Sequence, residues 1–252
     1  MTSSQSLDGE VAIITGASSG IGRATAHALA SRGANVTLAA RRQERLEAVG
    51  DRLESEYGVE AHPVRTNIRK EGDVENMVGR TVDEFGRLDV LVNNAGIVAD
   101  MTKPIEEMPT ESYRAIMETN ADGVFFATRE ALPHLQETDG TLVFVGSFTG
   151  KYPAPYTPVY AASKAWVQMF ARSVDSMVGD DGVAVTVVNP AETRTGLGGD
   201  DTGTPQEERY GPGEASEPEE LAEAIAFAAS LDVSTVSELD LFRPGRLADT
   251  FR

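Results

Sequence analysis

A cluster of three glycines, Gly16, Gly20 and Gly22, constrains the fold of this chain more than any other feature. Before it, residues 10–15 (EVAIIT) form a short run rich in β-branched side chains, which predicts a buried strand. After it, apolar residues recur at helical spacing over residues 21–29, which predicts a helix with one face on a core. A strand that stops at glycines and is followed by a helix indicates a tight turn whose backbone can approach another group closely.

Gly33 stands where a helix-ending glycine is expected, and residues 35–40 predict a second strand. Strand, glycine-rich turn, helix and strand make the βαβ unit of a dinucleotide-binding fold, although the spacing G-x-x-x-G-x-G differs from the common G-x-G-x-x-G. In such a unit the first glycine permits the turn, the second admits the pyrophosphate, and the third lets the helix pack on the strand, while the helix N-terminus attracts the phosphates. We assign the pyrophosphate contacts to this turn, that is, to Gly16, Ser18, Ser19, Gly20, Ile21 and Gly22.

The loop after the second strand bears on the choice between the two nicotinamide dinucleotides. The strand ends at Ala40, where an acidic residue would bind the 2′-hydroxyl of a ribose, and Arg41 and Arg42 follow. Because a guanidinium suits a 2′-phosphate, the loop favours NADP(H) over NAD(H). The alternative is that both arginines are solvated and only begin the helix of residues 43–57.

Strands and helices alternate along the chain, which is typical of an α/β fold: a single-domain, doubly wound parallel sheet, Rossmann-like, over residues 1–252. We expect residues 1–7 to be a flexible tail. Residues 196–214, rich in glycine and acidic residues, either cover a substrate pocket or form a solvated surface. Pro133 marks or kinks the end of a long helical region. Further strands are predicted at 61–65, 89–93, 141–146, 183–189 and 237–242, and further helices at 71–85, 111–136, 160–177 and 218–230.

Charge and composition exclude several classes of function. Lys and Arg number 22 against 40 Asp and Glu, a net charge of −18, so nucleic acid and anionic membranes are poor partners. The chain has no cysteine and only three scattered histidines, which argues against a metal site. No apolar run approaches the ~20 residues of a membrane span. Since no signal peptide is visible, we expect the cytoplasm.

The charge balance also bears on the solvent to which the protein is adapted. Only four of the 22 basic residues are lysines. Acid-rich, lysine-poor surfaces resemble those of proteins from halophilic organisms, where strong screening removes self-repulsion. We favour this halophilic interpretation over the alternative of an acidic enzyme from an ordinary environment.

Residues 147–164 (SFTGKYPAPYTPVYAASK) predict the chemistry. Tyr160 and Lys164 stand four apart, so on a helix both side chains project from one face. A nearby ammonium favours the phenolate and lowers a tyrosine pKa from ~10, which lets the phenol exchange a proton with an alcohol or ketone. Ser147 follows the apolar run of residues 141–146, so a strand end and a helix start would converge on one substrate oxygen. Taken alone, the Tyr-Lys spacing is more typical of a solvated helix face, and only the accompanying motifs favour a catalytic pair.

Together these motifs resemble the short-chain dehydrogenase/reductase family over residues 7 to about 244. The resemblance implies a sheet of about seven strands and reversible hydride transfer between a nicotinamide and a carbonyl or alcohol. It implies Tyr160 as general acid/base and Ser147 as hydrogen-bond partner of the substrate oxygen. It implies that Lys164 lowers the tyrosine pKa and holds the nicotinamide ribose, and that Asn120 anchors a relay water. The matched pieces, in family order, are TGASSGIG (15–22), NNAG (93–96), Asn120, Ser147, YAASK (160–164) and NPAETRT (189–195).

The same resemblance extends the cofactor site and marks three departures. It places Asn94 beside the cofactor ribose and Thr195 near the nicotinamide carboxamide. The departures are Asn67, where an aspartate is usual near the adenine, Ala191 in place of a glycine, and Glu192, a carboxylate near the expected pocket. The ending SELDLFRPGR is closer to the carbonyl reductase and 3-hydroxy-acid dehydrogenase branch than to ketoacyl reductases. The remaining cofactor residues implied are Asn67, Ile68, Ala95, Gly96, Pro190 and Thr193, besides Tyr160 and Lys164.

The leading hypothesis is an NADP-dependent oxidoreductase for a small carbonyl or secondary alcohol, of the carbonyl reductase, 3-hydroxy acid dehydrogenase or 3-oxoacyl reductase type. One alternative is a catalytically silent NADP-binding sensor or scaffold, although silent relatives usually lack the tyrosine or the lysine. Another is a dehydratase or epimerase of the longer sugar-nucleotide branch, for which the chain is short and the glycine spacing wrong. The apolar stripe around Trp166 and Phe170 predicts core packing or a subunit interface, and we expect a homotetramer or homodimer.

Overall fold

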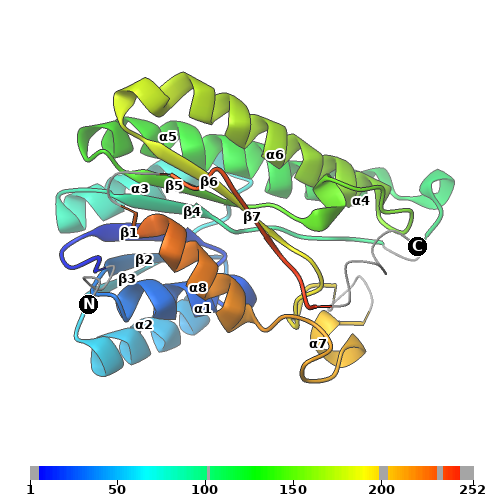
Figure 1. Ribbon diagram of the computed structural model, residues 1–252, viewed down its shortest axis with the longest axis horizontal. Helices are drawn as coiled ribbons and strands as arrows, with labels where there is room; N and C mark the ends of the chain where they lie inside the picture. Colours follow the sequence, from blue (N-terminus) through cyan, green and yellow to red (C-terminus); the bar gives the residue numbers. More distant parts are fainter. Residues whose placement is uncertain (1–5, 101–102, 199–203, 232–234, 245–252) are drawn as a thin grey trace.

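A computed structural model describes residues 6–100, 103–198, 204–231 and 235–244 of the chain. In these residues seven parallel strands form one sheet in the order β3-β2-β1-β4-β5-β6-β7, with helices on both faces (Figure 1). This confirms the doubly wound, Rossmann-like sheet predicted from the sequence. The strands are β1 Val11–Thr15, β2 Asn35–Ala40, β3 Ala61–Arg65, β4 Val90–Asn93, β5 Thr141–Val145, β6 Ala184–Pro190 and β7 Glu238–Leu241.

The helices cover the sheet in two layers (Figure 1). One layer holds α1, α2 and α8, and the other holds α3, α4, α5 and α6, while the short helix α7 lies beyond the sheet. Since every crossover between parallel strands must pass over a face, this arrangement buries both faces of the sheet. The helices are α1 Gly20–Ala30, α2 Gln43–Tyr57, α3 Glu71–Phe85, α4 Thr110–Met117, α5 Gly123–Glu137, α6 Pro158–Val178, α7 Gln206–Arg209 and α8 Pro218–Ala229.

The strands explain why their sequences read as continuous apolar runs. Successive strand residues point to opposite faces, so Ile14 packs with α1 and α8 while Ile13 packs with α3 and α5. Leu142 and Val143 of β5 divide between the two layers in the same way. All four side chains have no exposed surface. A two-sided core of this kind favours apolar residues at most positions of the central strands.

The motif residues meet because all strands run in the same direction. Gly16 follows β1, Arg41 follows β2, Asn94 follows β4 and Ser147 lies two residues past the end of β5. In a parallel sheet these carboxyl ends share one edge. The chain leaves β1 toward β2 and β3, and then returns to place β4 on the other side of β1. Ligands of such sheets bind in the crevice at this switch point.

The long predicted helix of residues 111–136 is interrupted in the structure. α4 ends at Met117, residues Glu118–Asp122 form a π-helical turn, and α5 continues to Glu137. Pro133 lies inside α5 and does not end it. Its ring is exposed, so water can reach the carbonyl group that loses its helical partner there.

The structure also corrects the boundary of the predicted flexible tail. Leu7, in the predicted flexible tail, is buried, and its N–H donates to the Arg32 carbonyl oxygen at 2.8 Å. Residues 1–5 of that tail lie outside the described residues.

The apolar stripe on α6 is buried in part. Trp166 stacks on Phe170 with ring centres 4.7 Å apart and packs on the core, whereas Met177 is 63% exposed. Over the ranges that the structure covers, no helix combines the length and apolar character needed to cross a membrane.

Candidate active site

Tyr160 and Lys164 lie in the first two turns of α6. Pro158 begins this helix, where proline is favoured because its φ angle suits a helix and its missing N–H is not needed. Lys164 is buried, and its Nζ donates a 2.7 Å hydrogen bond to the carbonyl oxygen of Val145 at the end of β5. The same Nζ lies 5.8 Å from the centre of the Tyr160 ring. The spacing of four residues therefore brings the phenol and the ammonium to one place beside a strand end.

The pKa values of this pair differ from the expectation in one respect. Burial raises the pKa of Tyr160 to about 12, and the neighbouring Ser147 hydroxyl lowers it only in part. Burial lowers the pKa of Lys164 from 10.5 to about 8. Desolvation of the phenolate dominates the Tyr160 pKa in this structure, and the Lys164 ammonium faces the Val145 carbonyl. That Lys164 lowers the tyrosine pKa stays a prediction. Near pH 7 the phenol therefore keeps its proton and the amine stays mostly charged.

Ser147 stands at the junction of β5 and a short 3₁₀ turn, Phe148–Gly150. Its extended backbone, with φ −170°, makes it the residue that caps this turn, and its Oγ accepts a hydrogen bond from the N–H of Thr149 at 3.2 Å. The Thr149 hydroxyl also donates to the same Oγ, at 2.9 Å. Ser147 is buried, with 8% of the residue exposed, and its hydroxyl keeps its own proton available for another acceptor. Its position beside the Tyr160 phenol brings two donors together.

Asn120 lies on the π-helical turn between α4 and α5, a rare conformation that is frequent at functional sites. Its buried side chain pairs with Ile97, whose N–H donates to Oδ1 and whose carbonyl oxygen accepts from Nδ2, both at 2.9 Å. Nδ2 also donates to Ser163 Oγ at 3.0 Å. A Cβ on Gly96 would lie 3.5 Å from both Asn120 Oδ1 and Lys164 Nζ. The amide and the ammonium therefore face the same small space beside this glycine.

The glycine turn between β1 and α1 leaves little room for side chains. Gly16 and Gly20 have φ angles of +73° and +54°, in the left-handed region that favours glycine. A Cβ on Gly22 would come within 2.5 Å of the Gly16 carbonyl oxygen and of Asn94 Nδ2, so this glycine lets α1 pack on its own turn rather than on a strand. The Ser19 side chain caps no N–H, and the first turn of α1 contains no acidic residue. The positive end of α1 is therefore suited to an anion.

Thr15 organises the loop after β4 and is a site residue that the motif analysis missed. Its Oγ1 accepts hydrogen bonds from the N–H groups of Asn94 and Ala95, both at 3.0 Å, and donates to the Val92 carbonyl oxygen at 3.1 Å. Asn94 Nδ2 donates in turn to the Thr15 carbonyl oxygen at 2.7 Å. Asn94, expected beside a ribose, thus ties its loop to the glycine turn, and Gly96 follows two residues later. The signal available in the sequence was the threonine that opens TGASSGIG.

Arg42 joins the loop after β2 to the glycine turn. Its Nη2 donates to Ser18 Oγ at 2.9 Å and to Ser19 Oγ at 3.0 Å. Arg41 beside it is exposed. The two serines also line a surface hollow of about 320 Å³ between α1 and α2, together with Arg23, Arg45 and Arg52. Positive charge is thus concentrated next to the turn, in a chain whose net charge is −18.

The other predicted cofactor residues border the same edge of the sheet. Asn67 follows β3, and its Oδ1 accepts from the N–H of Arg69 at 3.3 Å. Ile68 is buried against Gly123, whose missing side chain leaves room for it. Ile21, in the first turn of α1, is half-buried against the core on its side of the sheet. Asn67 and Ile68 thus lie past the end of β3, while Ile21 lies in the glycine turn itself.

The loop after β6 crosses over the glycine turn. Thr195 Cγ2 would lie 3.3 Å from a Cβ on Gly20, so the two segments are in contact range. Pro190 ends β6, and Thr193 forms a backbone bridge to Ser216, which anchors the far end of the loop. The part of residues 196–214 that the structure describes contains α7, and α7 is tied back by a hydrogen bond from the N–H of Glu207 to the Thr195 carbonyl oxygen at 3.1 Å. Glu192 is exposed.

Two further residues, not predicted as site residues, form hydrogen bonds with the catalytic candidates. Ser163 is fully buried, accepts from Asn120 and donates to the Tyr160 carbonyl oxygen at 2.7 Å. Gln168 is buried one turn after Lys164, and its Nε2 donates to the Ser147 carbonyl oxygen at 3.0 Å. Ser163 lies within YAASK, and Gln168 is a polar residue among apolar neighbours on α6, so each had a local signal.

Taken together, these features fit a dinucleotide with a nicotinamide at one end. The glycine turn admits a backbone-bound phosphate, Arg42 and its serines suit a phosphate ester, and the loop after β6 places Thr195 beside Gly20 of the turn. Within the described ranges, no group of three or more acidic or histidine side chains is placed to hold a metal ion.

Comparison with known proteins identifies relatives over most of the chain. Residues 10–205 match the family model described as short chain dehydrogenase. The chain is 34% identical over 237 residues to meso-2,3-butanediol dehydrogenase from Serratia marcescens, covering 92% of this chain and 91% of that one. It is 38% identical over 188 residues to 11-beta-hydroxysteroid dehydrogenase A from Sesamum indicum, covering 74% of this chain but only 53% of the longer relative. This chain therefore spans about half the length of the Sesamum protein.

Solved structures agree with this relationship. A 3-ketoacyl-(acyl-carrier-protein) reductase from Brucella melitensis complexed with NADH has a TM-score of 0.85 at 31% identity, covering 95% of this chain and 99% of that one. An alcohol dehydrogenase from the archaeon Thermococcus sibiricus complexed with 5-hydroxy-NADP has a TM-score of 0.84 at 31% identity, covering 93% and 97%. With the motifs, the parallel sheet and these matches in agreement, the chain belongs to the short-chain dehydrogenase family.

Proposed function

We propose that this protein is an NADP-dependent oxidoreductase that transfers a hydride between the nicotinamide and a carbonyl or secondary alcohol. The observation that carries the proposal is the meeting of Ser147, Tyr160 and Lys164 at the carboxyl end of β5, beside the glycine turn. A substrate of the carbonyl reductase, 3-hydroxy acid dehydrogenase or 3-oxoacyl reductase type would suit such a site. Relatives and structural neighbours whose names refer to hydroxysteroids, butanediol and 3-ketoacyl groups support the reaction class.

Each candidate residue has a separate role in the proposed reaction at the substrate oxygen. Tyr160, which keeps its proton near pH 7, donates it to the oxygen as a carbonyl is reduced. The Ser147 hydroxyl donates a hydrogen bond to the same oxygen and stabilises the developing negative charge. The charge of Lys164 favours that transfer and its ammonium is suited to ribose hydroxyls, while Asn120 faces the space beside it. When bound, the nicotinamide supplies or accepts the hydride.

The preference for NADP rests on the loop after β2. Arg42 already gathers the hydroxyls of Ser18 and Ser19, and Arg41 is exposed next to it. Ala40 provides no carboxylate to bind a ribose 2′-hydroxyl or repel a phosphate. The neighbouring structures hold either NADH or an NADP derivative, so the family allows both cofactors and the local residues decide.

Replacing both Arg41 and Arg42 by alanine should weaken NADPH binding far more than NADH binding. Up to two charge-assisted contacts are lost, each worth ~1.5–3 kcal/mol, so we expect NADPH affinity to fall at least about tenfold. Calorimetric titration with each cofactor measures the difference. Arg80→Ala, on α3 and across the sheet, is the control for loss of positive charge. An equal loss for both cofactors in the double variant would show that these arginines do not read the 2′-phosphate.

The direct test of the proposed function is oxidation of NADPH with a panel of aliphatic ketones, 3-oxo esters and diketones, followed at 340 nm. We expect turnover with at least one class of carbonyl. The competing candidate is a catalytically silent NADP-binding sensor or scaffold, which would bind NADPH and turn over none of them. NADPH binding without turnover on the whole panel, and no oxidation of the corresponding alcohols with NADP⁺, would favour that candidate.

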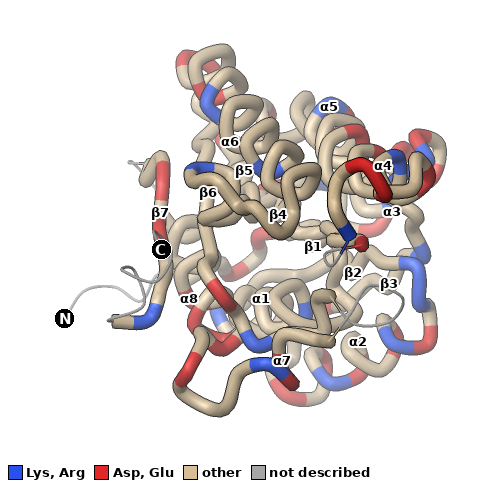
Figure 2. Tube along the Cα trace, turned by 90° about the vertical axis from the view of Figure 1, so that its right-hand side faces the viewer, with Lys and Arg blue, Asp and Glu red and all other residues tan. Residues whose placement is uncertain are grey.

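We further propose that the protein is a halophilic, cytoplasmic homotetramer or homodimer. Acidic residues are spread over helices of both layers (Figure 2), so repulsion acts on the whole fold. Because the Debye length shrinks from about 30 Å at 0.01 M to about 3 Å at 1 M salt, the melting temperature should rise with KCl into the molar range. Calorimetry and sedimentation between about 0.2 and about 3 M KCl test this. A flat melting temperature would exclude halophilic adaptation and leave the reductase proposal intact.

A further inference from the structure

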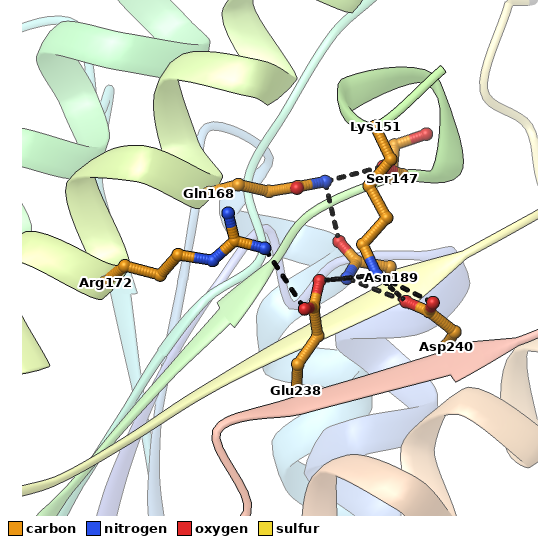
Figure 3. Close-up of polar contacts among 7 residues, drawn as sticks. All are labelled: Ser147, Lys151, Gln168, Arg172, Asn189, Glu238 and Asp240. Atoms are coloured by element: carbon orange, nitrogen blue, oxygen red, sulfur yellow. Dashed lines mark hydrogen bonds and ion pairs between the residues drawn. The ribbon is translucent and has the colours of Figure 1, made fainter.

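The last strand, β7, carries two acidic side chains where a parallel sheet ordinarily has apolar ones. Leu239 and Leu241 pack on the core beside α1 and α8. Glu238 and Asp240 alternate with them and therefore point to the opposite face, toward α6 and the turn after Ser147. Figure 3 shows both carboxylates directed at the same group of polar residues. Glu238 is half-buried on this edge strand, and its charge therefore calls for partners.

Lys151 is the main partner of these carboxylates. Its Nζ lies 2.7 Å from Glu238 Oε1 and 2.6 Å from both oxygens of Asp240 (Figure 3). The lysine side chain is 17% exposed, so the pair is screened less than an ordinary surface pair. Although burial works against it, hydrogen bonds from Lys151 and Arg172 lower the pKa of Glu238. Lys151 stands four residues after Ser147, at the end of the same 3₁₀ turn.

A second connection runs from β7 to the backbone of Ser147 itself. Asn189 Nδ2 donates to Glu238 Oε1 at 2.6 Å and to Asp240 Oδ1 at 3.0 Å. Gln168 Nε2 donates to Asn189 Oδ1 at 3.1 Å and to the Ser147 carbonyl oxygen at 3.0 Å (Figure 3). Each of these contacts joins a side-chain N–H donor to an oxygen acceptor. The network therefore fixes both the start and the end of the turn that carries Ser147.

Glycines next to the side chains of this network leave the room that those side chains need. A Cβ on Gly146 would lie 2.2 Å from Asn189 Oδ1, and a Cβ on Gly150 would lie 2.8 Å from Gln168 Nε2. Gly146 before the turn and Gly150 at its end thus leave the space that the amides occupy. Phe242, next along the same face of the chain after β7, packs edge-on against Phe148 with ring centres 5.6 Å apart. Polar and aromatic contacts from the C-terminal strand segment converge on this one turn.

We propose that Lys151 and Gln168 are positioning residues for Ser147, and that β7 braces the turn through them. The ammonium clamps the end of the turn to Glu238 and Asp240, and the Gln168 amide holds the Ser147 carbonyl at its start. This inference rests on the proposed function, in which the Ser147 hydroxyl binds the substrate oxygen. Because hydrogen bonds to a reacting oxygen depend on placement to a fraction of an ångström, loosening the turn should slow turnover without touching the cofactor.

The test compares two variants that break ion pairs to the same carboxylate. Lys151→Met should lower kcat about tenfold or more and leave NADPH affinity unchanged, because misplacement of a reacting group by about an ångström can cost a hundredfold. Arg172→Met removes a 3.1 Å ion pair to Glu238, but Arg172 lies on α6 rather than on the turn, so kcat should stay unchanged. Lys151→Arg should restore most of the activity. Gln168→Met gives an independent measurement from the other end of the turn.

Melting temperatures separate loss of fold from loss of position. Equal kcat in Lys151→Met, Gln168→Met and wild type, with folded proteins, would overturn the proposal. So would an equal kcat loss in Arg172→Met, which would indicate a general effect of Glu238. In a Ser147→Ala background, Lys151→Met should change kcat little if the lysine acts through the serine, and a full additive loss would contradict this. Wild-type turnover by Ser147→Ala would instead refute the proposed function; if that variant has no measurable turnover, the Lys151–Arg172 comparison decides alone.

Discussion

Tyr160→Phe is expected to abolish carbonyl reduction while leaving NADPH binding nearly intact. The substitution removes only the phenolic oxygen, which is the proton donor, and keeps the ring that lies 5.8 Å from Lys164 Nζ. General acid catalysis of this kind contributes about 10²–10⁴-fold, so kcat should fall by at least about a hundredfold. Steady-state kinetics with any active carbonyl, together with titration of NADPH fluorescence, measures both quantities.

A matched control for this substitution lies four residues upstream. Tyr156 is 78% exposed, so Tyr156→Phe removes the same atom from a solvated ring and should retain wild-type kcat. The folded state of both variants should have nearly the same stability as wild type. Turnover of Tyr160→Phe within tenfold of wild type would show that another group delivers the proton.

Lys164→Met should lower turnover and NADPH affinity but raise the stability of the cofactor-free protein. It should remove most turnover, because the charge beside the phenol is lost, and it should weaken NADPH binding, because the ammonium is proposed to hold the ribose hydroxyls. It should also stabilise the cofactor-free protein near pH 7. The fall of the Lys164 pKa from 10.5 to about 8 corresponds to roughly 3 kcal/mol that the buried charge removes from the stability of the fold. Loss of the hydrogen bond to Val145 offsets about 1 kcal/mol of the gain.

The pH dependence of unfolding provides a separate check on Lys164. Between about pH 8 and pH 10.5 the unfolded chain still binds the proton that the native lysine has released, so the stability of wild type should rise with pH across this window. The advantage of Lys164→Met should therefore be complete below about pH 8 and vanish by pH 10.5. Urea titrations of the two cofactor-free proteins measure it. If Lys164→Met is less stable than wild type at pH 7, the buried ammonium does not destabilise the fold. Unchanged NADPH affinity in this variant would refute the proposed contact of Lys164 with the ribose.

Much of the fold could be predicted from local pattern. Apolar runs bounded by glycines and polar residues marked most of the strands, and α2 and α3 begin and end at the predicted residues. The two misplaced features had non-local causes. The π-helical turn around Asn120 interrupts a pattern that is helical on both sides, and Leu7 is held by the backbone of Arg32 and the core rather than by its neighbours.

The residues of the candidate site could be predicted from the sequence, but their pKa values and hydrogen-bond partners could not. Spacing placed Tyr160 beside Lys164, and strand ends placed Ser147 near both. Their pKa values depend on how much solvent the surrounding elements exclude, which a spacing of four residues does not contain. Thr15 and Gln168 were overlooked because a hydroxyl or amide acquires a role only when a particular carbonyl or N–H is brought to it.

By itself, the sequence determined the parallel sheet and the edge at which the motifs gather, because both follow from periodicity and from glycines at strand ends, which act over a few residues. Only the tertiary structure decided which side chains face one another across that edge. The link from Lys151 to Asp240 joins residues 89 positions apart, and no local preference of either residue indicates the other. The physical reason is that hydrogen bonds, ion pairs and desolvation act through space over a few ångströms. Their partners are therefore set by how β7, α6 and the Ser147 turn pack together.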